Sequence, residues 1–146
     1  MTQTRPHRPL VVVGVDGSAE AQAAAGWAAE YVKGTGGSLE LVTAWHWPVA
    51  YGYPMSATGY DPESSAHTIA DEAAKKVDLP QQTLQITVVA GVPAQVLVAA
   101  SARADLLVVG SRGLGGFSGL LMGSVGAHCV HHAACPVLVY RPPTSS

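Results

Sequence analysis

Residues 110–124 read GSRGLGGFSGLLMGS and contain six glycines. They follow the apolar run Leu106–Val109, which is typical of a buried strand, and precede Val125–His132, which is typical of a helix. Glycine lets a ligand approach the main chain closely, and successive N–H groups of such a loop can form an anion-binding concavity. Gly123 and Ser124 come directly before the helix, where N–H groups and the helix dipole favour a phosphate. The stretch therefore predicts a strand–loop–helix unit that binds a nucleotide phosphate.

Strand-like and helix-like segments alternate along the rest of the chain, which predicts an α/β fold. This alternation requires right-handed crossovers and a parallel sheet with helices on both faces. Leu10–Val15 and Leu106–Val109 are apolar throughout and suit the centre, whereas the alternating segment 82–89 suits an edge. We therefore expect a single-domain, open parallel five-stranded sheet in the order 3-2-1-4-5. The expected strands are 10–15, 38–44, 82–89, 105–109 and 136–140, and the expected helices are 19–33, 63–77, 93–102 and 124–132.

The predicted strand order brings two candidate ligand-binding stretches together. Ligands of such sheets bind outside the carboxyl ends of the strands at the topological switch point, here between strands one and four. Asp16 follows strand one and Gly110 follows strand four. Asp16 suits a ribose hydroxyl, an adenine amine or Mg²⁺, or else forms a turn by capping Gly17 or Ser18. Arg112, the only Lys or Arg of the loop, is either a phosphate partner or a solvated surface arginine.

Composition sets the remaining bounds. The chain has 146 residues, 12% of them charged, and a net charge of -2, which is consistent with one domain and shows no nucleic-acid footprint. We expect a disordered tail over 1–9, the domain over 10–141 and a second tail over 142–146. No apolar stretch reaches the length of a membrane span and no signal peptide is apparent. The two cysteines suggest reduced thiols in the cytoplasm.

The last expected strand has an exposed edge in the predicted order. Val137–Tyr140 is apolar and carries no charge, and an unprotected edge of this kind invites pairing with another chain. We therefore expect a homodimer through Val137–Tyr140. The alternative is that a tail or a loop covers this edge.

With Gly110, Gly113, Gly123 and Ser124 at their spacing, the chain resembles the universal stress protein family, of the ATP-binding type. That family's fingerprint is Gly, two residues, Gly, nine residues, Gly and then Ser or Thr. The resemblance implies an adenine nucleotide alpha hydrolase-like fold that binds ATP, with Mg²⁺ possible, and that commonly dimerises through the last strand. The residues that carry the resemblance are Gly110, Gly113, Gly123 and Ser124, with the segments 13–18, 105–113 and 135–139.

The predicted nucleotide site combines these observations. The resemblance implies that Asp16 and the backbone around Ala44 face the adenosine, and that the glycine loop holds the ribose and phosphates. No catalytic residue and no metal ligand is assigned. The predicted binding residues are Gly14, Val15, Asp16, Ala44, Val109, Gly110, Arg112, Gly113, Gly123, Ser124 and Val125.

Two other features stay open at the level of sequence. His128 and His132 have metal-ligand spacing on a helix, with His131 nearby, but the cysteines do not complete a known ligand pattern. The alternative is a set of exposed histidines near a helix C-terminus, where the dipole favours their cationic form. The segment 45–62 could form a lid over an adenine or could cover apolar surface of the sheet.

The leading functional hypothesis is a cytoplasmic, ATP-binding stress-response sensor or regulatory module. Any ATP hydrolysis should be slow, because phosphoryl transfer needs positioned metals and charge stabilisers. The first alternative is a Mg²⁺-dependent ATPase or nucleotidyl-transfer enzyme that uses Asp16 as a metal ligand. The others are a cyclic-AMP-binding protein and a nucleotide-free, dimeric interaction protein.

Overall fold

The computed structural model describes residues 7–47, 49–50, 53–54, 61–112 and 123–143. The strands are β1 (Leu10–Gly14), β2 (Ser38–Trp45), β3 (Val49–Ala50), β4 (Tyr53–Pro54), β5 (Leu84–Ala90), β6 (Leu106–Gly110) and β7 (Val137–Tyr140). The helices are α1 (Ala19–Thr35), α2 (Pro62–Lys75), α3 (Pro93–Ser101) and α4 (Ser124–His132), with a 3₁₀ turn η1 at Gln81–Thr83. Every strand and helix expected from the sequence is present, with bounds shifted by one or two residues.

The main sheet has five parallel strands in the order β5-β2-β1-β6-β7. Counted without the short β3 and β4, this is the predicted order 3-2-1-4-5, which is therefore confirmed. Val11, Val12 and Val13 of the central strand are fully buried, as expected for a strand that is covered on both faces. β5 and β7 form the two edges of the sheet, as predicted.

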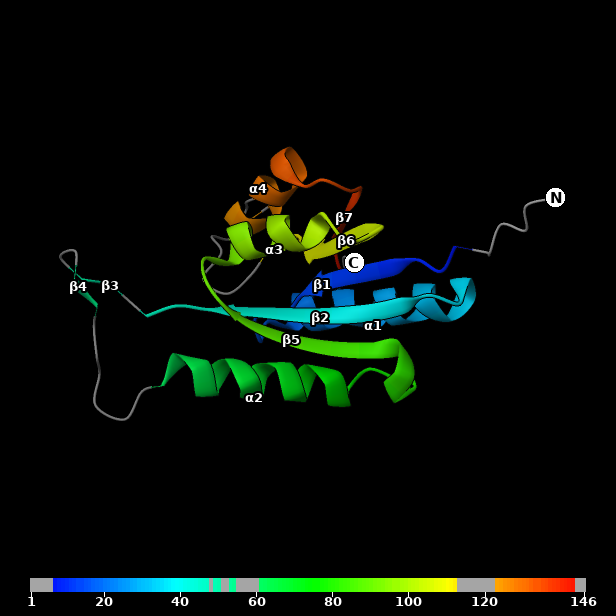
Figure 1. Ribbon diagram of the computed structural model, residues 1–146, viewed down its shortest axis with the longest axis horizontal. Coiled ribbons are helices and arrows are strands. Elements are labelled where there is room, and N and C mark those ends of the chain that lie inside the picture. Colours follow the sequence, from blue (N-terminus) through cyan, green and yellow to red (C-terminus); the bar gives the residue numbers. More distant parts are fainter. Residues whose placement is uncertain (1–6, 48, 51–52, 55–60, 113–122, 144–146) are drawn as a thin grey trace.

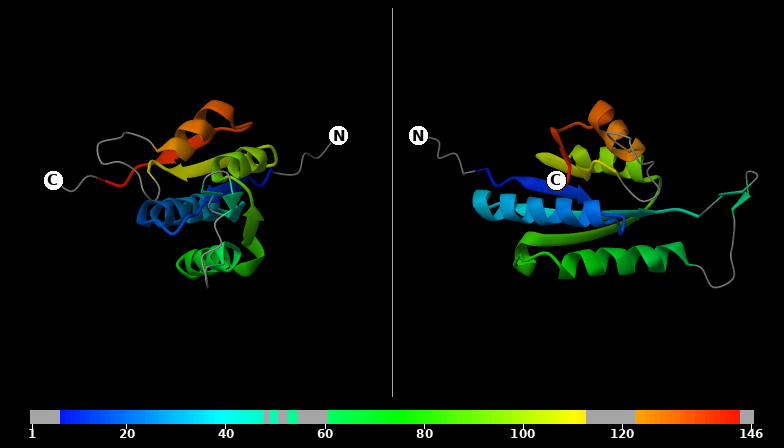
Figure 2. Two further views of the ribbon diagram at one scale, coloured as in Figure 1. Left: turned by 90° about the vertical axis from the view of Figure 1, so that its left-hand side faces the viewer. Right: turned by 180° about the vertical axis from the view of Figure 1, so that it is seen from behind.

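Helices cover both faces of the sheet (Figures 1 and 2). α1 and α2 pack on one face, where alanines of both helices meet Leu39, Leu41 and Val108. α3 and α4 pack on the other face, where Leu97 and Cys129 meet alternate residues of the same strands. Small alanines let α1 lie close to the strands, and most of the largest fully buried hydrophobic side chains come from the sheet.

The helix starts differ in how they are capped. The Ser18 hydroxyl accepts the N–H of Ala21 at 3.2 Å at the start of α1, and the Asp61 carboxylate accepts two N–H groups at the start of α2. α4 begins after Gly123, which has no side chain to act as a cap. The first N–H groups of an α-helix have no partner within the helix, and among the described residues no side chain at the N-cap position bonds to those of α4.

A buried carboxylate fixes α3 against the sheet. Glu40 on β2 is 1% exposed, and its Oε2 accepts the Thr87 hydroxyl and an Arg103 N–H, each at 2.7 Å. A buried charge needs such partners because removal from water is costly. Glu40 on β2 therefore connects this strand to β5 and to the turn after α3.

The two ends of the domain and the segment 45–62 complete the description. His7 Nε2 lies 2.7 Å from Asp105 Oδ1, so the described end of the expected tail contacts the start of β6. Within 45–62, β3 and β4 form an antiparallel hairpin, which lies beyond the carboxyl end of β2 (Figures 1 and 2). In the described part of the chain, no helix has both the length and the apolar character that crossing a bilayer requires.

Candidate functional site

The register of the sheet brings the predicted site residues to one edge. Gly14 pairs with Val42 and Val13 pairs with Val108, and the Val15 N–H donates to the Val42 carbonyl at 2.9 Å. The chain therefore leaves β1 near the end of β6 and beside Val42, from which β2 continues three residues further to Trp45. This is the switch point, because the crossovers from β1 and β6 run to opposite sides.

Asp16 shapes the turn between β1 and α1. Its Oδ1 accepts the Ser18 N–H at 2.9 Å, and Gly17 adopts a left-handed φ of 89° that glycine tolerates without strain. Asp16 thus makes the turn contact that the sequence left as the alternative to a ligand contact. A carboxylate has two oxygens with several acceptor positions, so this contact does not by itself exclude a ligand.

The start of α4 lies against the end of β6. The Gly123 N–H donates to the Ser111 carbonyl, which holds the helix start beside the loop that follows β6. Ser124, the first residue of α4, is exposed, and Val125 packs partly into the core. Within the described residues no N-cap side chain bonds to the N–H groups of this first turn, and with the helix dipole such groups suit an anion.

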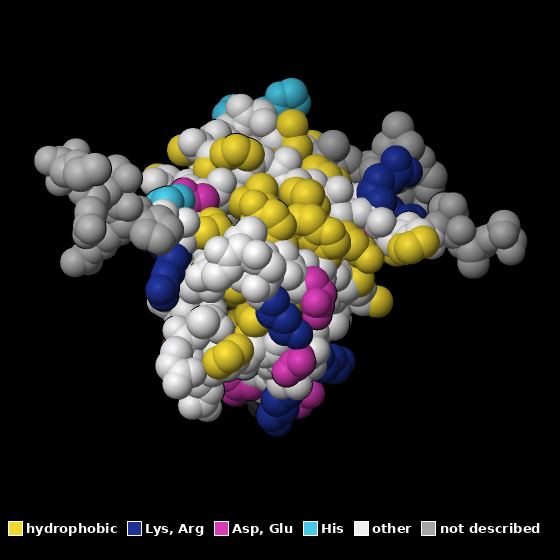
Figure 3. All heavy atoms as spheres, turned by 90° about the vertical axis from the view of Figure 1, so that its right-hand side faces the viewer, with side chains coloured by type: hydrophobic (Ala, Val, Ile, Leu, Met, Phe, Trp, Pro, Cys, Tyr) yellow, Lys and Arg dark blue, Asp and Glu magenta, His cyan; other side chains and the backbone are white. Residues whose placement is uncertain are grey.

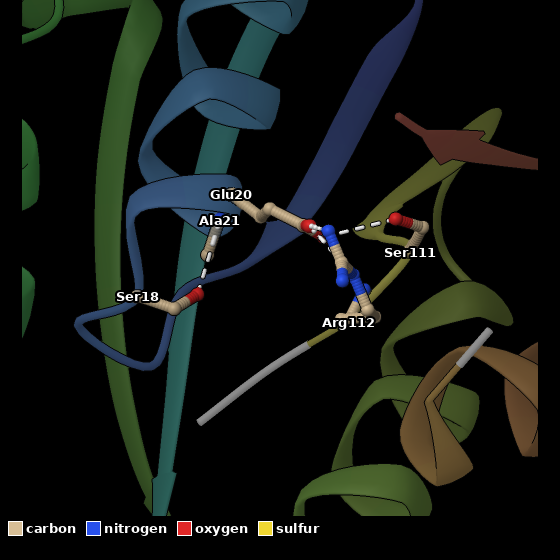
Figure 4. Close-up of polar contacts among 5 residues, drawn as sticks. All are labelled: Ser18, Glu20, Ala21, Ser111 and Arg112. Carbon is tan, nitrogen blue, oxygen red and sulfur yellow. Dashed lines mark hydrogen bonds and ion pairs between the residues drawn. The ribbon is translucent and has the colours of Figure 1, made fainter. Parts of the chain in front are cut away.

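Glu20 is a site residue that the sequence analysis missed (Figure 4). Its Oε1 accepts Arg112 Nε at 3.0 Å and Arg112 Nη2 at 2.9 Å. Its Oε2 accepts the Arg112 main-chain N–H at 2.7 Å and the Ser111 hydroxyl at 2.9 Å. We call these three residues the Glu20 latch. Arg112 is therefore neither a simple solvated arginine nor an unpaired phosphate partner, because an internal carboxylate already binds it.

The ionisation of Glu20 reflects these contacts. Partial burial acts to raise the pKa of Glu20, but the hydrogen bonds from the Arg112 N–H and the Ser111 hydroxyl, with the Arg112 side chain, lower the pKa below its ordinary value. The latch is thus an ion pair at neutral pH. The sequence signal for it was weak, since an acidic residue in the first turn of a helix is common for electrostatic reasons alone.

The glycines of the predicted site have packing roles that the structure reveals. A Cβ at Gly14 would lie 2.6 Å from Leu97 Cδ1, so this glycine lets α3 approach β1. A Cβ at Gly110 would lie 3.3 Å from Glu20 Cβ, so that glycine lets the first turn of α1 approach β6. Gly113 lies outside the described residues.

Val15, Val109 and Ala44 reach the edge through their main chains. The side chains of Val15 and Val109 are buried in the core at 4% and 3% exposure, so only backbone groups of these residues could face a ligand. Ala44 pairs with Val89 of β5. Beside that pair lies a hollow of about 310 Å³ between β5 and α3, with Val42, Val89, Val92 and Val96 among its lining residues, which the sequence did not predict.

The histidines of α4 lie close to one another. The rings of His128 and His132 lie 4.4 Å apart, and those of His131 and His132 lie 6.4 Å apart. In the ranges that the structure describes, no group of three or more His, Cys, Asp or Glu residues is arranged to hold a metal ion. Both cysteines are free thiols.

Comparison with known proteins tests the expected family. The profile of the universal stress protein family matches residues 9–141. Two universal stress proteins of Mycobacterium tuberculosis are 35% identical over 144 residues and 36% identical over 140 residues, and each comparison covers 93% of this chain. Each covers 46% of the relative, so the chain spans about half the length of the curated relatives it matches.

Solved structures show the same fold. A universal stress protein in complex with cAMP matches with a TM-score of 0.68 and 29% identity, over 92% of this chain and 97% of that chain. The universal stress protein UspA from Lactobacillus plantarum matches with a TM-score of 0.72 and 23% identity, over 92% of this chain and 99% of that chain, a likeness of fold. With nearly its whole length matched by the family profile, the chain belongs to the universal stress protein family.

Proposed function

We propose that this chain is an adenine-nucleotide-binding module whose ligand lies across the carboxyl edge of the sheet, between β1, β6 and the start of α4. The observation that carries the proposal is the N-terminus of α4, which follows a glycine with no side chain to cap it and is held beside the switch point by the hydrogen bond between Gly123 and Ser111. Exposed N–H groups at a helix start bind phosphate by hydrogen bonds and by the dipole. The relative whose structure holds cAMP supports an adenine nucleotide as the ligand class.

The site residues take separate roles in this proposal. The N–H groups of Ser124 and Val125 and the Ser124 hydroxyl meet a phosphate. Asp16 meets a ribose hydroxyl, and the adenine lies near Ala44, where the valines beside the Ala44–Val89 pair offer apolar surface. The glycine spacing of the sequence favours ATP among the adenine nucleotides. Asp16 is the carboxylate that would contact a Mg²⁺ ion accompanying it.

A regulatory role suits this site better than rapid catalysis. The one Lys or Arg of the glycine loop, Arg112, is engaged by Glu20, whereas rapid phosphoryl transfer needs cations directed at the transferring group. We therefore propose a cytoplasmic stress-response module that reports nucleotide binding to other proteins.

A homodimer through β7 is part of the proposal. Leu107 N–H donates to the Pro136 carbonyl and Ser111 N–H donates to the Tyr140 carbonyl, so alternate residues of β7 bond to β6. The main-chain groups of Val137 and Val139 then point to the open edge. Figure 3 shows hydrophobic side chains gathered over a broad area of the face seen from the right of Figure 1. Apolar area of this kind on a protein surface favours association.

Titration calorimetry tests the proposed function. The intact chain is titrated with ATP, ADP, AMP and cyclic AMP, each with and without Mg²⁺, and with GTP as a control for the base. We expect saturable heat with at least one adenine nucleotide and weaker binding of GTP. Absence of heat with all adenine nucleotides would overturn the proposal and favour a nucleotide-free interaction protein.

A further inference from the structure

The Glu20 latch holds the only Lys or Arg of the glycine loop. Both oxygens of the carboxylate are used, one by two guanidinium nitrogens and the other by a main-chain N–H and a hydroxyl. These donor types are the ones that proteins use to bind phosphate. In Figure 4 the Glu20 side chain extends from α1 to Ser111 and Arg112 at the end of β6. An internal carboxylate therefore occupies groups that a phosphate could otherwise use.

The latch is part of the packing of the fold. The Glu20 side chain is 15% exposed and that of Arg112 is 44% exposed, so the carboxylate lies inside and the arginine lies at the surface. Ser111 is 3% exposed, and its main chain bonds to β7 on one side and to the residue before α4 on the other. The close approach of Gly110 to Glu20 fixes the distance between α1 and β6. Glu20 is thus held at the junction of four elements.

Charge determines how this arrangement treats different nucleotides. The N–H groups of α4 can serve one phosphate without any cation. Each further phosphate adds negative charge, which a cation could balance. The one Lys or Arg of the glycine loop is Arg112, and Glu20 neutralises the charge of Arg112. The Glu20 carboxylate also repels anionic groups that approach the same donors. A nucleotide with one phosphate is little affected, whereas a polyphosphate loses the partner that its outer phosphates need.

We propose that Glu20 is a specificity-determining residue of the nucleotide site, which weakens the binding of adenosine polyphosphates relative to AMP by neutralising Arg112. The inference rests on the proposed function, because it requires that the site binds adenine nucleotides. Glu20 sets the ratio of affinities and is not required for binding itself.

The test compares Glu20→Gln with wild type by calorimetry with ATP and AMP. Glutamine keeps an acceptor for Ser111 and the Arg112 N–H but loses the charge. We expect the Kd for ATP to fall by about tenfold, the size of one charge-assisted hydrogen bond gained, and the Kd for AMP to change by less than about twofold. Glu30→Gln is the matched control, since Glu30 lies on the same helix, is exposed and pairs with Lys33. It should leave both Kd values unchanged.

A second variant assigns the effect to Arg112. In an Arg112→Gln background, Glu20→Gln should no longer improve ATP binding, which a double-mutant cycle measures directly. Should Glu20→Gln fail to fold, Arg112→Lys tests the same point, because lysine cannot reproduce the two-nitrogen contact with Glu20 Oε1. The Arg112→Lys protein should also bind ATP more tightly than the wild type does. If the wild type binds adenine nucleotides but Glu20→Gln leaves the ratio of the Kd values for ATP and AMP unchanged, or weakens the binding of both nucleotides equally, this inference alone is overturned. A wild-type protein that binds no adenine nucleotide would overturn the proposed function with it.

Discussion

Replacement of Ser124 by proline removes one N–H from the start of α4 while keeping the helix. Ser124 is the first helical residue and is exposed, and proline is well accepted at this position, where the N–H has no partner within the helix. The preceding Gly123 has φ -75° and ψ 170°, the extended conformation that a residue before proline requires. We therefore expect Ser124→Pro to fold normally and to bind the nucleotide phosphate more weakly.

The magnitude follows from the bonds that are removed. A hydrogen bond to a charged group contributes about 1.5–3 kcal/mol, so loss of one N–H should raise the Kd for AMP by roughly 10- to 100-fold. Ser124→Ala is the matched control, because it removes the hydroxyl and keeps the N–H. Calorimetry with AMP measures both variants, and thermal melting by circular dichroism checks that both are folded.

Comparison of the two variants shows whether the Ser124 N–H or the Ser124 hydroxyl contacts the phosphate. If the folded Ser124→Pro and Ser124→Ala proteins both bind AMP as tightly as the wild type does, the start of α4 does not hold the phosphate and the proposed placement of the ligand is wrong. If the wild type binds AMP and both variants lose binding equally, the hydroxyl alone is the contact.

Three further predictions concern the dimer, the packing of the edge and the latch. Val139→Pro removes an N–H from the open side of β7, where an edge strand tolerates proline; it should shift the protein to monomer in sedimentation velocity, whereas Val139→Thr should not, and a Val139→Pro dimer would contradict pairing through this edge. Gly14→Ala should lower the free energy of unfolding in urea by about 1–3 kcal/mol through overpacking, while Gly26→Ala, whose new methyl meets no atom within 4 Å, should raise it by about 1 kcal/mol. Because the pKa of Glu20 is lowered from 4.5, the stability of its ionised form is present above the unfolded pKa and is lost as pH falls through the lower folded value. The difference in melting temperature between wild type and Glu20→Gln should therefore shrink below about pH 4.5, and a constant difference across this range would be evidence against the latch.

Much of the fold could be predicted because its signals are local. The continuous apolar residues of β1 and β6 and the alternation in β5 placed these strands at the centre and at an edge. Ser18 stands directly before α1 and caps it through the Ala21 N–H, and a serine before a helix is itself a local signal. These features depend on neighbours within a few residues, so periodicity and side-chain chemistry are enough to reveal them.

The candidate site could be predicted only in outline. Strand order placed Asp16 and Gly110 at one edge, because the carboxyl ends of parallel strands on either side of a switch point must lie together. The strand order locates backbone segments. It does not reveal which side chains fill the space between them, and it left the role of Arg112 open between two readings, neither of which involved Glu20.

By itself, the sequence determined the order of elements, the edges of the sheet and the glycine spacing on which the proposed nucleotide site depends. Only the tertiary structure decided the side-chain partners: Glu20 with Arg112, 92 residues apart, and Glu40 with Arg103, 63 residues apart. The structure likewise shows that a side chain at position 14 would meet Leu97 of α3. The physical reason is that such pairs depend on how strands register and helices dock. The residues next to a charged side chain in the sequence do not reveal which distant side chain the fold will place beside it.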